Sequence, residues 1–437
     1  MTILNIHERR EAVSPEVSAE AFRRGVIQRH RNHVNKGLAR VADLMGTHVE
    51  TRSADNYVFD EQGERYLDCG GYGVFTLGHC HPAVVAAVTE QLHRLPISTR
   101  SLVNAEVGDA AEAMVSVTPP GLDYVYFGSS GTEATEAAIK LAYLNGRTSL
   151  ISTHGGYHGK TLGALSVTGR PSYREPFRAI LAPVEFVRFG DVEELSAALA
   201  HADSKGCVIV EPVQAEGGVI IPPDGYLREV ERLCRQHGAF LILDEIQTGL
   251  ARLGTWWGMD REQVVPDILL SGKALGGGVV PVSAMVASST AYEKLNQSPL
   301  MHTSTFSGNP LAASAVRSTI EVMRTEHVPE KAHALGETLL ARLATLRARH
   351  SRLLRDLRGR GILIGMEFRA DHLAGDFMGE MLKKHVIVSY SLNAHRVVRL
   401  TPPAFLSDAD VNWVVEAVEE SMSILDRRYP NVPGEES

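Results

Sequence analysis

Cysteine, long apolar runs and excess positive charge are all scarce in this chain of 437 residues. The four cysteines are scattered and form no CxxC pair, which argues against a disulfide framework and favours a reducing cytoplasm. No apolar run approaches the ~20 residues that a membrane-spanning helix needs. The formal net charge of −8 disfavours nucleic acid or an anionic membrane as a main partner.

Two further absences concern export and metal binding. The first residues, MTILNIHERREAVSPE, contain no apolar core like that of a signal peptide. The cluster His79-Cys80-His81 has one-residue spacing and no evident distant third ligand. Zinc sites need ligands that converge from separated positions, so we expect no metal centre here.

The composition and patterning are those of a large α/β protein. Hydrophobic residues make up 44% and charged residues 22% of the chain, which predicts a substantial core and two closely packed domains. From about residue 100 to 320, short apolar strands alternate with helices, which predicts a mainly parallel sheet covered on both faces. After residue 325 a smaller α+β unit begins. The predicted division is 1–75 for the N-terminal part of a small domain, 76–325 for a large domain and 326–437 for the C-terminal small domain.

Local patterns predict individual elements. Residues 21–45 look helical, and NYVFDEQGERYLDC is typical of a β-hairpin turned at Gln62-Gly63. Pro82 is suited to the first turn of the next helix, since proline there needs no amide hydrogen.

A lysine and an aspartate end two of the predicted apolar strands. Lys273 follows DILLSG and precedes a run of glycines, and Asp244 ends LILD. A lysine at a buried strand end has a lowered pKa and a nucleophilic amine. A nearby carboxylate can keep a heterocyclic nitrogen protonated, so the pair predicts a pyridoxal phosphate (PLP) site. Alone, a lysine at a strand end is more often a surface lysine, and an aspartate there is more often a helix cap.

A small-residue loop precedes the helix EATEAAIKLA. It runs from Gly128 through Ser129, Ser130 and Gly131 to Thr132. Backbone amides and hydroxyls at a helix N-terminus form a cradle for a phosphate, although an ordinary Ser/Thr cap is the alternative. The segment matches neither GxGxxG nor GxxxxGK[ST], which disfavours a nucleotide-binding enzyme or switch.

Three more side chains suit a planar cofactor. Tyr157 follows a strand and a glycine pair, where its ring can stack flat on the cofactor, or it can be a core tyrosine. Gln247 lies three residues past Asp244 and can reach a ring substituent such as a phenolic oxygen. Ile246 would place an apolar face behind the ring.

Seven motifs, in order, carry a family resemblance. From about residue 35 onward the chain resembles the class III (ornithine/acetylornithine/ω-amino) aminotransferases, and it looks closest to the putrescine (diamine) aminotransferases. The motifs are SGTEATEAAIKLA, YHGKT, EPVQAEGGVIIPPDGYL, LILDEIQTGLARLG, PDILLSGKALGGG, HTSTFSGNPLA and RLTPPA.

The resemblance implies a type I PLP-dependent transferase fold, like that of aspartate aminotransferase. It implies a large domain with a mainly parallel sheet, a small α+β domain built from both chain ends, and a homodimer with shared active sites. Lys273 would hold PLP as a Schiff base and move the proton, and Asp244 would pair with the pyridinium nitrogen. The other implied cofactor residues are Ser130, Gly131 and Thr132 at the phosphate, Tyr157 and His158 at the ring, Gln247 at the 3′-oxygen, and Thr305 at the neighbouring subunit's phosphate.

The resemblance also implies a substrate site. Arg399 would bind the α-carboxylate of glutamate or 2-oxoglutarate, and Glu216 would shield it through a switchable salt bridge. Tyr72 and Lys160 complete the implied set. Ornithine-type members have HGRT where this chain has HGKT, and a lysine lacks the bidentate fork of an arginine.

The expected reaction is therefore ping-pong transamination of a terminal primary amine, with 2-oxoglutarate or pyruvate as the second partner. Three alternatives stay open: an acetylornithine- or ornithine-type aminotransferase, a class III PLP mutase or decarboxylase, and a catalytically silent PLP-fold or nucleotide-binding module.

Overall fold

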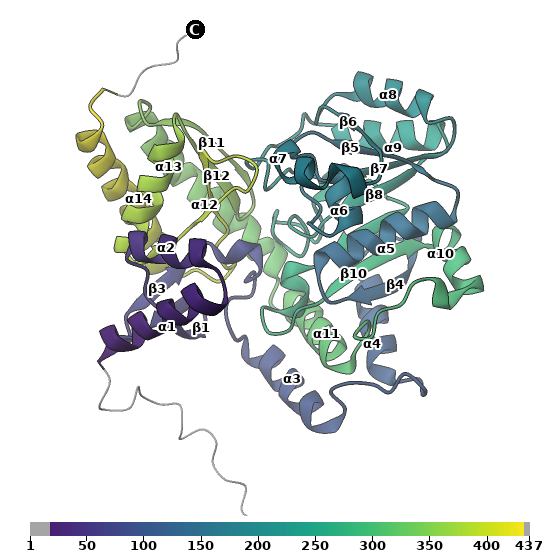
Figure 1. Cartoon of the computed structure of the whole chain (residues 1–437), viewed down its shortest axis with the longest axis horizontal. Coiled ribbons are helices and arrows are strands. Elements are labelled where there is room, and N and C mark those ends of the chain that lie inside the picture. The colour runs from purple at the N-terminus through teal and green to yellow at the C-terminus, as the bar shows by residue number, and fades with distance from the viewer. Residues whose placement is uncertain (1–17, 432–437) are drawn as a thin grey trace, which may run out of the picture.

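Three β-sheets and the helices around them make up the computed structural model, which describes residues 18–431 (Figure 1). The first residues, on which the argument against a signal peptide rests, lie outside this range. Within residues 18–431, no helix is both long enough and apolar enough to cross a membrane.

The largest sheet has seven strands in the order β4-β10-β9-β8-β7-β5-β6. The pairs β9/β8, β8/β7, β7/β5 and β5/β6 are parallel, and β10 is antiparallel to both of its neighbours. The prediction of a mainly parallel sheet is therefore confirmed. The strands are β4 (Leu122–Gly128), β5 (Ser149–Thr153), β6 (Val184–Val187), β7 (Gly206–Val210), β8 (Phe240–Asp244), β9 (Ile268–Ser271) and β10 (Ser283–Ser288).

Helices cover both faces of this sheet because its strands are apolar on both sides. In β8, Phe240 and Ile242 pack into one core and Leu241 and Leu243 into another. The first core lies under α5 (Gly131–Leu144) and α10 (Ser289–Gln297), in front of the sheet in Figure 1. The helices that contribute to the second core include α4 (Ala105–Val115), α8 (Val192–His201), α9 (Tyr226–Gln236) and α11 (Pro310–Thr325).

The remaining two sheets join the ends of the chain. The parallel pair β3/β13 aligns Leu67 with Val386, so an N-terminal and a C-terminal segment share one sheet of order β1-β2-β3-β13. The other sheet, β11-β12-β15-β14, is antiparallel. This arrangement agrees with the expected small α+β unit, whereas the exact domain boundaries stay a prediction. The strands are β1 (Glu50–Ala54), β2 (Tyr57–Asp60), β3 (Arg65–Asp68), β11 (Leu354–Arg360), β12 (Leu363–Phe368), β13 (Val386–Ile387), β14 (Ser389–Tyr390) and β15 (Val397–Leu400).

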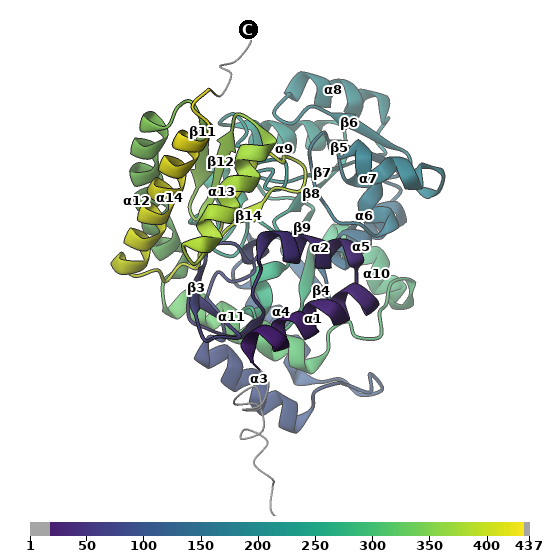
Figure 2. The same cartoon turned by 60° about the vertical axis from the view of Figure 1, so that its left-hand side comes forward.

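Helices α12 (Val328–Arg349), α13 (Asp371–Lys383) and α14 (Asp408–Arg428) lie together over the C-terminal sheet (Figure 2). At the other end of the chain, the region 21–45 forms two helices and not one. The break occurs because the Asn35 side chain accepts hydrogen bonds from the amides of Gly37 and Leu38 and so begins a second helix. The remaining long helices are α1 (Ala19–His33), α2 (Lys36–Met45) and α3 (Pro82–Arg94).

Two local predictions are confirmed. The hairpin β2/β3 turns through Gly63, whose φ of +83° lies in the left-handed region that favours glycine. Pro82 occupies the first turn of α3.

The buried side chain of Arg252 joins three parts of the chain. Its guanidinium donates to the carbonyls of Gly73, Ile362 and Pro402 and to the hydroxyl of Thr76. Burial lowers the pKa of Arg252 to about 9. The hydrogen bonds compensate for that burial, and they fix the N-terminal and C-terminal segments to the turn after β8.

Replacing this arginine should weaken the whole assembly. Arg252→Met leaves four acceptors without their donor, so we expect about 2–4 kcal/mol of destabilisation. The thermal midpoint, measured at one protein concentration with saturating cofactor, should fall by several degrees. Arg178→Met is the control because the Arg178 side chain is 82% exposed. Equal midpoints for the two variants would contradict the joining role.

Candidate active site

A cavity of about 520 Å³ lies at the carboxyl edge of the seven-stranded sheet. Carboxyl ends of parallel strands meet at one edge, so segments that are far apart in sequence converge there. The cavity brings together ten of the predicted residues. Its lining is formed by Gly131, Thr132, Tyr157, His158, Gly159, Lys160, Thr161, Glu211, Glu216, Asp244, Ile246, Gln247 and Lys273.

Asp244 and Lys273 lie on neighbouring strand ends. Asp244 is aligned with Leu270 across β8 and β9, and Lys273 follows three residues later. The backbone of Lys273 has a φ of +46°, a strained conformation for a residue with a side chain. Burial, followed by the charge of Arg399, lowers the pKa of the Lys273 ammonium, although Glu216 and Asp244 oppose this effect. A lysine with a lowered pKa is suited to form an imine with a carbonyl.

The Asp244 carboxylate is held by two donors. His158 Nδ1 lies 2.7 Å from Asp244 Oδ2, and the amide of Ile246 donates to Oδ1 at 3.1 Å. Burial opposes protonation of His158, but the hydrogen bond and charge of Asp244 outweigh it and raise the pKa of the imidazole. The carboxylate is thereby fixed at the floor of the cavity, where a ring nitrogen could meet it.

The side-chain amide of Gln247 is buried with neither its oxygen nor its nitrogen paired. A side chain at Gly73 would lie 2.2 Å from Gln247 Nε2, and Gly73 has a φ of +74°. Glycine is therefore required where the N-terminal segment passes over this amide. The unpaired amide is a ready partner for a polar substituent of a bound ring.

The opposite end of the cavity is suited to an anion. Ser130 is the N-cap residue of α5, yet its side chain makes no capping hydrogen bond. Thr132 Oγ1 lies 2.7 Å from Thr161 Oγ1, and a side chain at Gly159 would come within 2.5 Å of it. The first-turn amides of α5 and these hydroxyls are suited to hold a phosphate.

Tyr157 is positioned by a buried acid that sequence reasoning missed. Glu211 Oε1 accepts from the Tyr157 amide at 2.9 Å, and Oε2 accepts from the Ala215 amide at 3.3 Å. Burial raises the pKa of Glu211 to about 7. An acidic residue after the apolar strand CVIV is the same pattern that identified Asp244, so the sequence did contain the indication.

Arg399 and Glu216 form a buried ion pair behind the cavity. Arg399 NH2 lies 2.8 Å from Glu216 Oε1, and their side chains are 0% and 5% exposed. Arg399 Nε and NH1 are buried without a hydrogen-bond partner. The guanidinium therefore has donors left over for a second carboxylate.

Four predicted residues lie outside the cavity lining. Arg399 is paired with Glu216, which does line the cavity, and Ser130 is the N-cap residue of α5. Tyr72 is 56% exposed, and its backbone φ is +50°. Thr305 is exposed on the surface. Within one chain, Thr305 therefore does not line the cavity with the other predicted cofactor residues.

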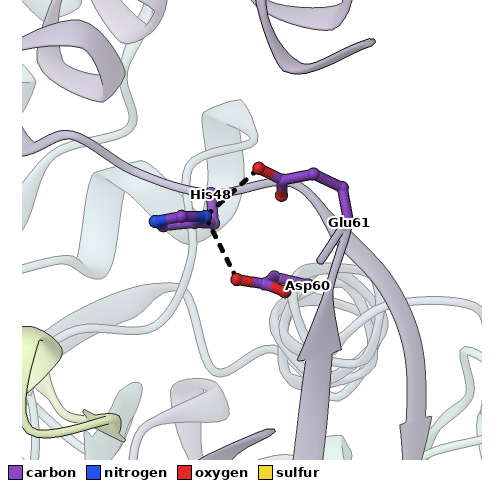
Figure 3. Close-up of side chains that lie close together, drawn as sticks. All are labelled: His48, Asp60 and Glu61. Atoms are coloured by element: carbon purple, nitrogen blue, oxygen red, sulfur yellow. Dashed lines mark hydrogen bonds and ion pairs between the residues drawn. The ribbon is translucent and has the colours of Figure 1, made fainter. Parts of the chain in front are cut away.

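A separate group of possible ligands was not predicted (Figure 3). His48 Nδ1 lies 3.1 Å from both Asp60 Oδ2 and Glu61 Oε1. Both carboxylates already accept backbone hydrogen bonds, since Asp60 Oδ1 receives the Gln62 and Glu64 amides and Glu61 Oε2 receives the Val49 amide. The three side chains therefore hold the hairpin turn in place.

Comparison with known proteins agrees with this site. The family model described as aminotransferase class-III matches residues 39–422. A putrescine aminotransferase from Pectobacterium atrosepticum is 38% identical over 436 residues, covering 96% of this chain and 93% of that protein.

Solved structures give the same result. An ornithine aminotransferase from Toxoplasma gondii, with PLP partly occupying its active site, has a TM-score of 0.85 and 29% identity, covering 95% of this chain and 100% of that chain. An (S)-enantioselective ω-transaminase from Thermomicrobium roseum has a TM-score of 0.85 and 28% identity, covering 94% of this chain and 99% of that chain.

The chain belongs to the class III aminotransferases and is a PLP-dependent enzyme of the type I fold. The cavity fits that cofactor. It contains a lysine of lowered pKa, a fixed carboxylate, an unpaired buried amide and an anion cradle.

Removing the charge of Asp244 should slow chemistry more than cofactor binding. We expect Asp244→Asn to reduce the single-turnover rate with an amine about 10²- to 10³-fold, because a neutral amide cannot stabilise a protonated ring nitrogen. Cofactor content, read from visible absorbance, should fall much less. Asp224→Asn is the matched control, since the Asp224 side chain is 81% exposed. A near-native single-turnover rate in Asp244→Asn would refute this role.

Proposed function

We propose that this enzyme transfers the amino group of a terminal primary amine, such as a diamine or an ω-amino compound, to 2-oxoglutarate or pyruvate by a ping-pong mechanism. The observation that carries the proposal is the buried pair of Arg399 and Glu216. It lets one site accept first a substrate without a carboxylate and then one with a carboxylate. The similarity to a putrescine aminotransferase supports the same class of donor.

The predicted cofactor residues then have the following tasks. Bound PLP supplies an electron sink for the charge that develops at the substrate carbon. Lys273 holds the cofactor and carries the proton at that carbon. Asp244 keeps the ring nitrogen protonated, with His158 orienting the carboxylate. Tyr157 stacks on the ring, Gln247 binds its 3′-oxygen, and the start of α5 (Ser130 to Thr132) binds the phosphate.

The two states of Glu216 separate the two half-reactions. An unpaired Arg399 beside a carboxylate-free amine would be a costly buried charge. Glu216 neutralises it in the donor half-reaction and must turn away when a dicarboxylate arrives. Arg399 then binds that carboxylate with its free donors.

Lys160 favours ω-amines over α-amino acids attacked at the α-position, such as ornithine. Its Nζ lies 4.2 Å from the centre of the Tyr173 ring and 5.9 Å from that of Tyr157. These cation–π contacts occupy the ammonium, which also lacks the bidentate fork of an arginine. Tyr72 belongs to the same substrate wall, beside Tyr390, whose pKa is raised by burial and by Tyr72.

A half-reaction screen tests the proposed function. The PLP form is mixed with diamines, ω-amino acids and α-amino acids while the visible absorbance of the bound cofactor is followed. Fast loss with diamines and slow loss with ornithine or acetylornithine would support it, and the reverse order would favour the ornithine-type alternative. Release of CO2, or movement of the amine within one molecule, would favour a decarboxylase or mutase. No response to any amine would indicate a silent module.

The active enzyme is a homodimer in this proposal. Helix α1 buries no residue in its own chain. Large apolar side chains are exposed at three separate places in the sequence: Val34 and Leu38, Leu102, and Leu300. Exposed apolar area of this extent is typical of a surface that a second copy covers.

The proposal also includes the division of the chain into an N-terminal part of the small domain (1–75), a large domain (76–325) and a C-terminal small domain (326–437). It places the enzyme in the cytoplasm. The free thiols of Cys69, Cys80, Cys207 and Cys234 support a reducing compartment.

Thr305 should act in the neighbouring subunit. A Lys273→Ala subunit is mixed with a Thr305→Ala subunit under conditions that exchange chains. In a mixed dimer, one site then carries both defects and the other carries neither, so activity should exceed the sum of the two parents. Activity no higher than that sum would count against a contribution across the interface.

Arg399 should serve one half-reaction more than the other. We expect Arg399→Ala to slow the 2-oxoglutarate half-reaction about 10- to 100-fold, because a charge-assisted contact is lost, and to spare the amine half-reaction. Glu216→Ala should instead raise glutamate turnover relative to the amine. The double variant Arg399→Ala/Glu216→Gln controls for an unpaired buried carboxylate. An equal loss in both half-reactions would make Arg399 merely structural.

A further inference from the structure

The second oxygen of Glu216 is bound by the backbone of the C-terminal segment. Oε1 meets Arg399, while Oε2 accepts the amide of Leu392 at 2.8 Å. The carbonyl of Glu216 also accepts the amide of Asn393 at 2.9 Å. A carboxylate that turns away from Arg399 must therefore also release Leu392.

The loop that supplies these amides, residues 391–394, is anchored to the large sheet's connections at three more points. The Arg170 guanidinium donates to the Asn393 carbonyl. The Asn393 side chain donates to the Gly155 carbonyl at 2.9 Å. The Tyr173 hydroxyl donates to the Leu392 carbonyl at 3.0 Å. The backbone of Leu392 is thus held on both sides: its carbonyl accepts from Tyr173, and its amide donates to Glu216.

We infer that loop 391–394 is a latch on Glu216, and that Tyr173 is a positioning residue which sets the preference between carboxylate-free amines and dicarboxylates. The inference rests on the proposed function, since it assumes that Glu216 moves. Tyr173 acts on substrate choice through the latch, because its hydroxyl is engaged with Leu392.

The latch biases the site toward amines by a shift in population. A hydrogen bond that forms only while Glu216 faces Arg399 stabilises this paired state. It therefore lowers the fraction of molecules in which Arg399 is free to bind a carboxylate. The apparent affinity for a dicarboxylate falls with that fraction, while an amine is unaffected. Weakening the latch should therefore lower the KM for 2-oxoglutarate and leave the amine half-reaction nearly unchanged.

The test uses Tyr173→Phe in the full-length holoenzyme. This change removes the hydroxyl and keeps the ring on which Lys160 lies. The ratio of kcat/KM for 2-oxoglutarate to that for the amine should rise about 2- to 10-fold, the usual range for one hydrogen bond. Tyr429→Phe is the matched control, because its hydroxyl donates to Asp376 on another part of the chain. Asn393→Ala, which removes the hydrogen bond from the Asn393 side chain to the Gly155 carbonyl, should shift the ratio in the same direction. It replaces Tyr173→Phe in the test if that variant folds poorly.

The decisive arm repeats Tyr173→Phe in a Glu216→Ala background. With no carboxylate to latch, the substitution should no longer change the ratio, so the two effects should not add. An equal shift in both backgrounds, or no shift in the parent with either anchor variant, would overturn the inference. If the parent enzyme fails to react with any amine, the proposed function fails instead. A selective loss of the 2-oxoglutarate half-reaction in Arg399→Ala, without any effect of Tyr173→Phe, would overturn the latch alone.

Discussion

The buried ion pair between Arg399 and Glu216 is the constraint on which the rest of the site depends. A guanidinium at this depth is tolerable only while a carboxylate or a dicarboxylic substrate compensates for its lost hydration. Arg399 belongs to the C-terminal antiparallel sheet, and Glu216 follows strand β7 of the large sheet. The pair therefore links the two parts of the molecule at the cavity. Breaking it to admit a dicarboxylate also removes a contact between these parts, so substrate choice and the packing of the two parts depend on the same equilibrium.

The large sheet builds the cavity by bringing several strand ends together. Parallel strands bring the ends of β5, β7, β8 and β9 to one edge, so Asp244, Lys273 and Glu211 meet although they are far apart in sequence. The carboxylates of Asp244 and Glu211 are buried, and each is fixed by hydrogen bonds from neighbouring groups. Arg252 performs the corresponding task outside the cavity, where it holds the chain ends against the turn after β8.

Much of this was predictable because it follows local patterns. Apolar strands that end in a charged residue identified Asp244 and Lys273, and a loop of small residues identified the start of α5. The helical prediction for residues 21–45 did not place the break at Asn35, which depends on the hydrogen bonds that its side chain accepts from the amides of Gly37 and Leu38. The partners of Tyr173 and Arg252 could not be predicted, since nearly all of them are backbone carbonyls whose positions only the folded chain defines. The proposed role of Thr305 depends on a second chain, so the fold of one chain does not bring it to the cavity.

The most direct test of the account is a crystal structure of the pyridoxamine form of the enzyme with glutarate, a dicarboxylate that cannot accept the amino group. The account predicts a glutarate carboxylate on the guanidinium of Arg399, with Glu216 turned away and its hydrogen bond to Leu392 broken. A structure in which glutarate occupies the cavity while Glu216 keeps its 2.8 Å contact with Arg399 would contradict it.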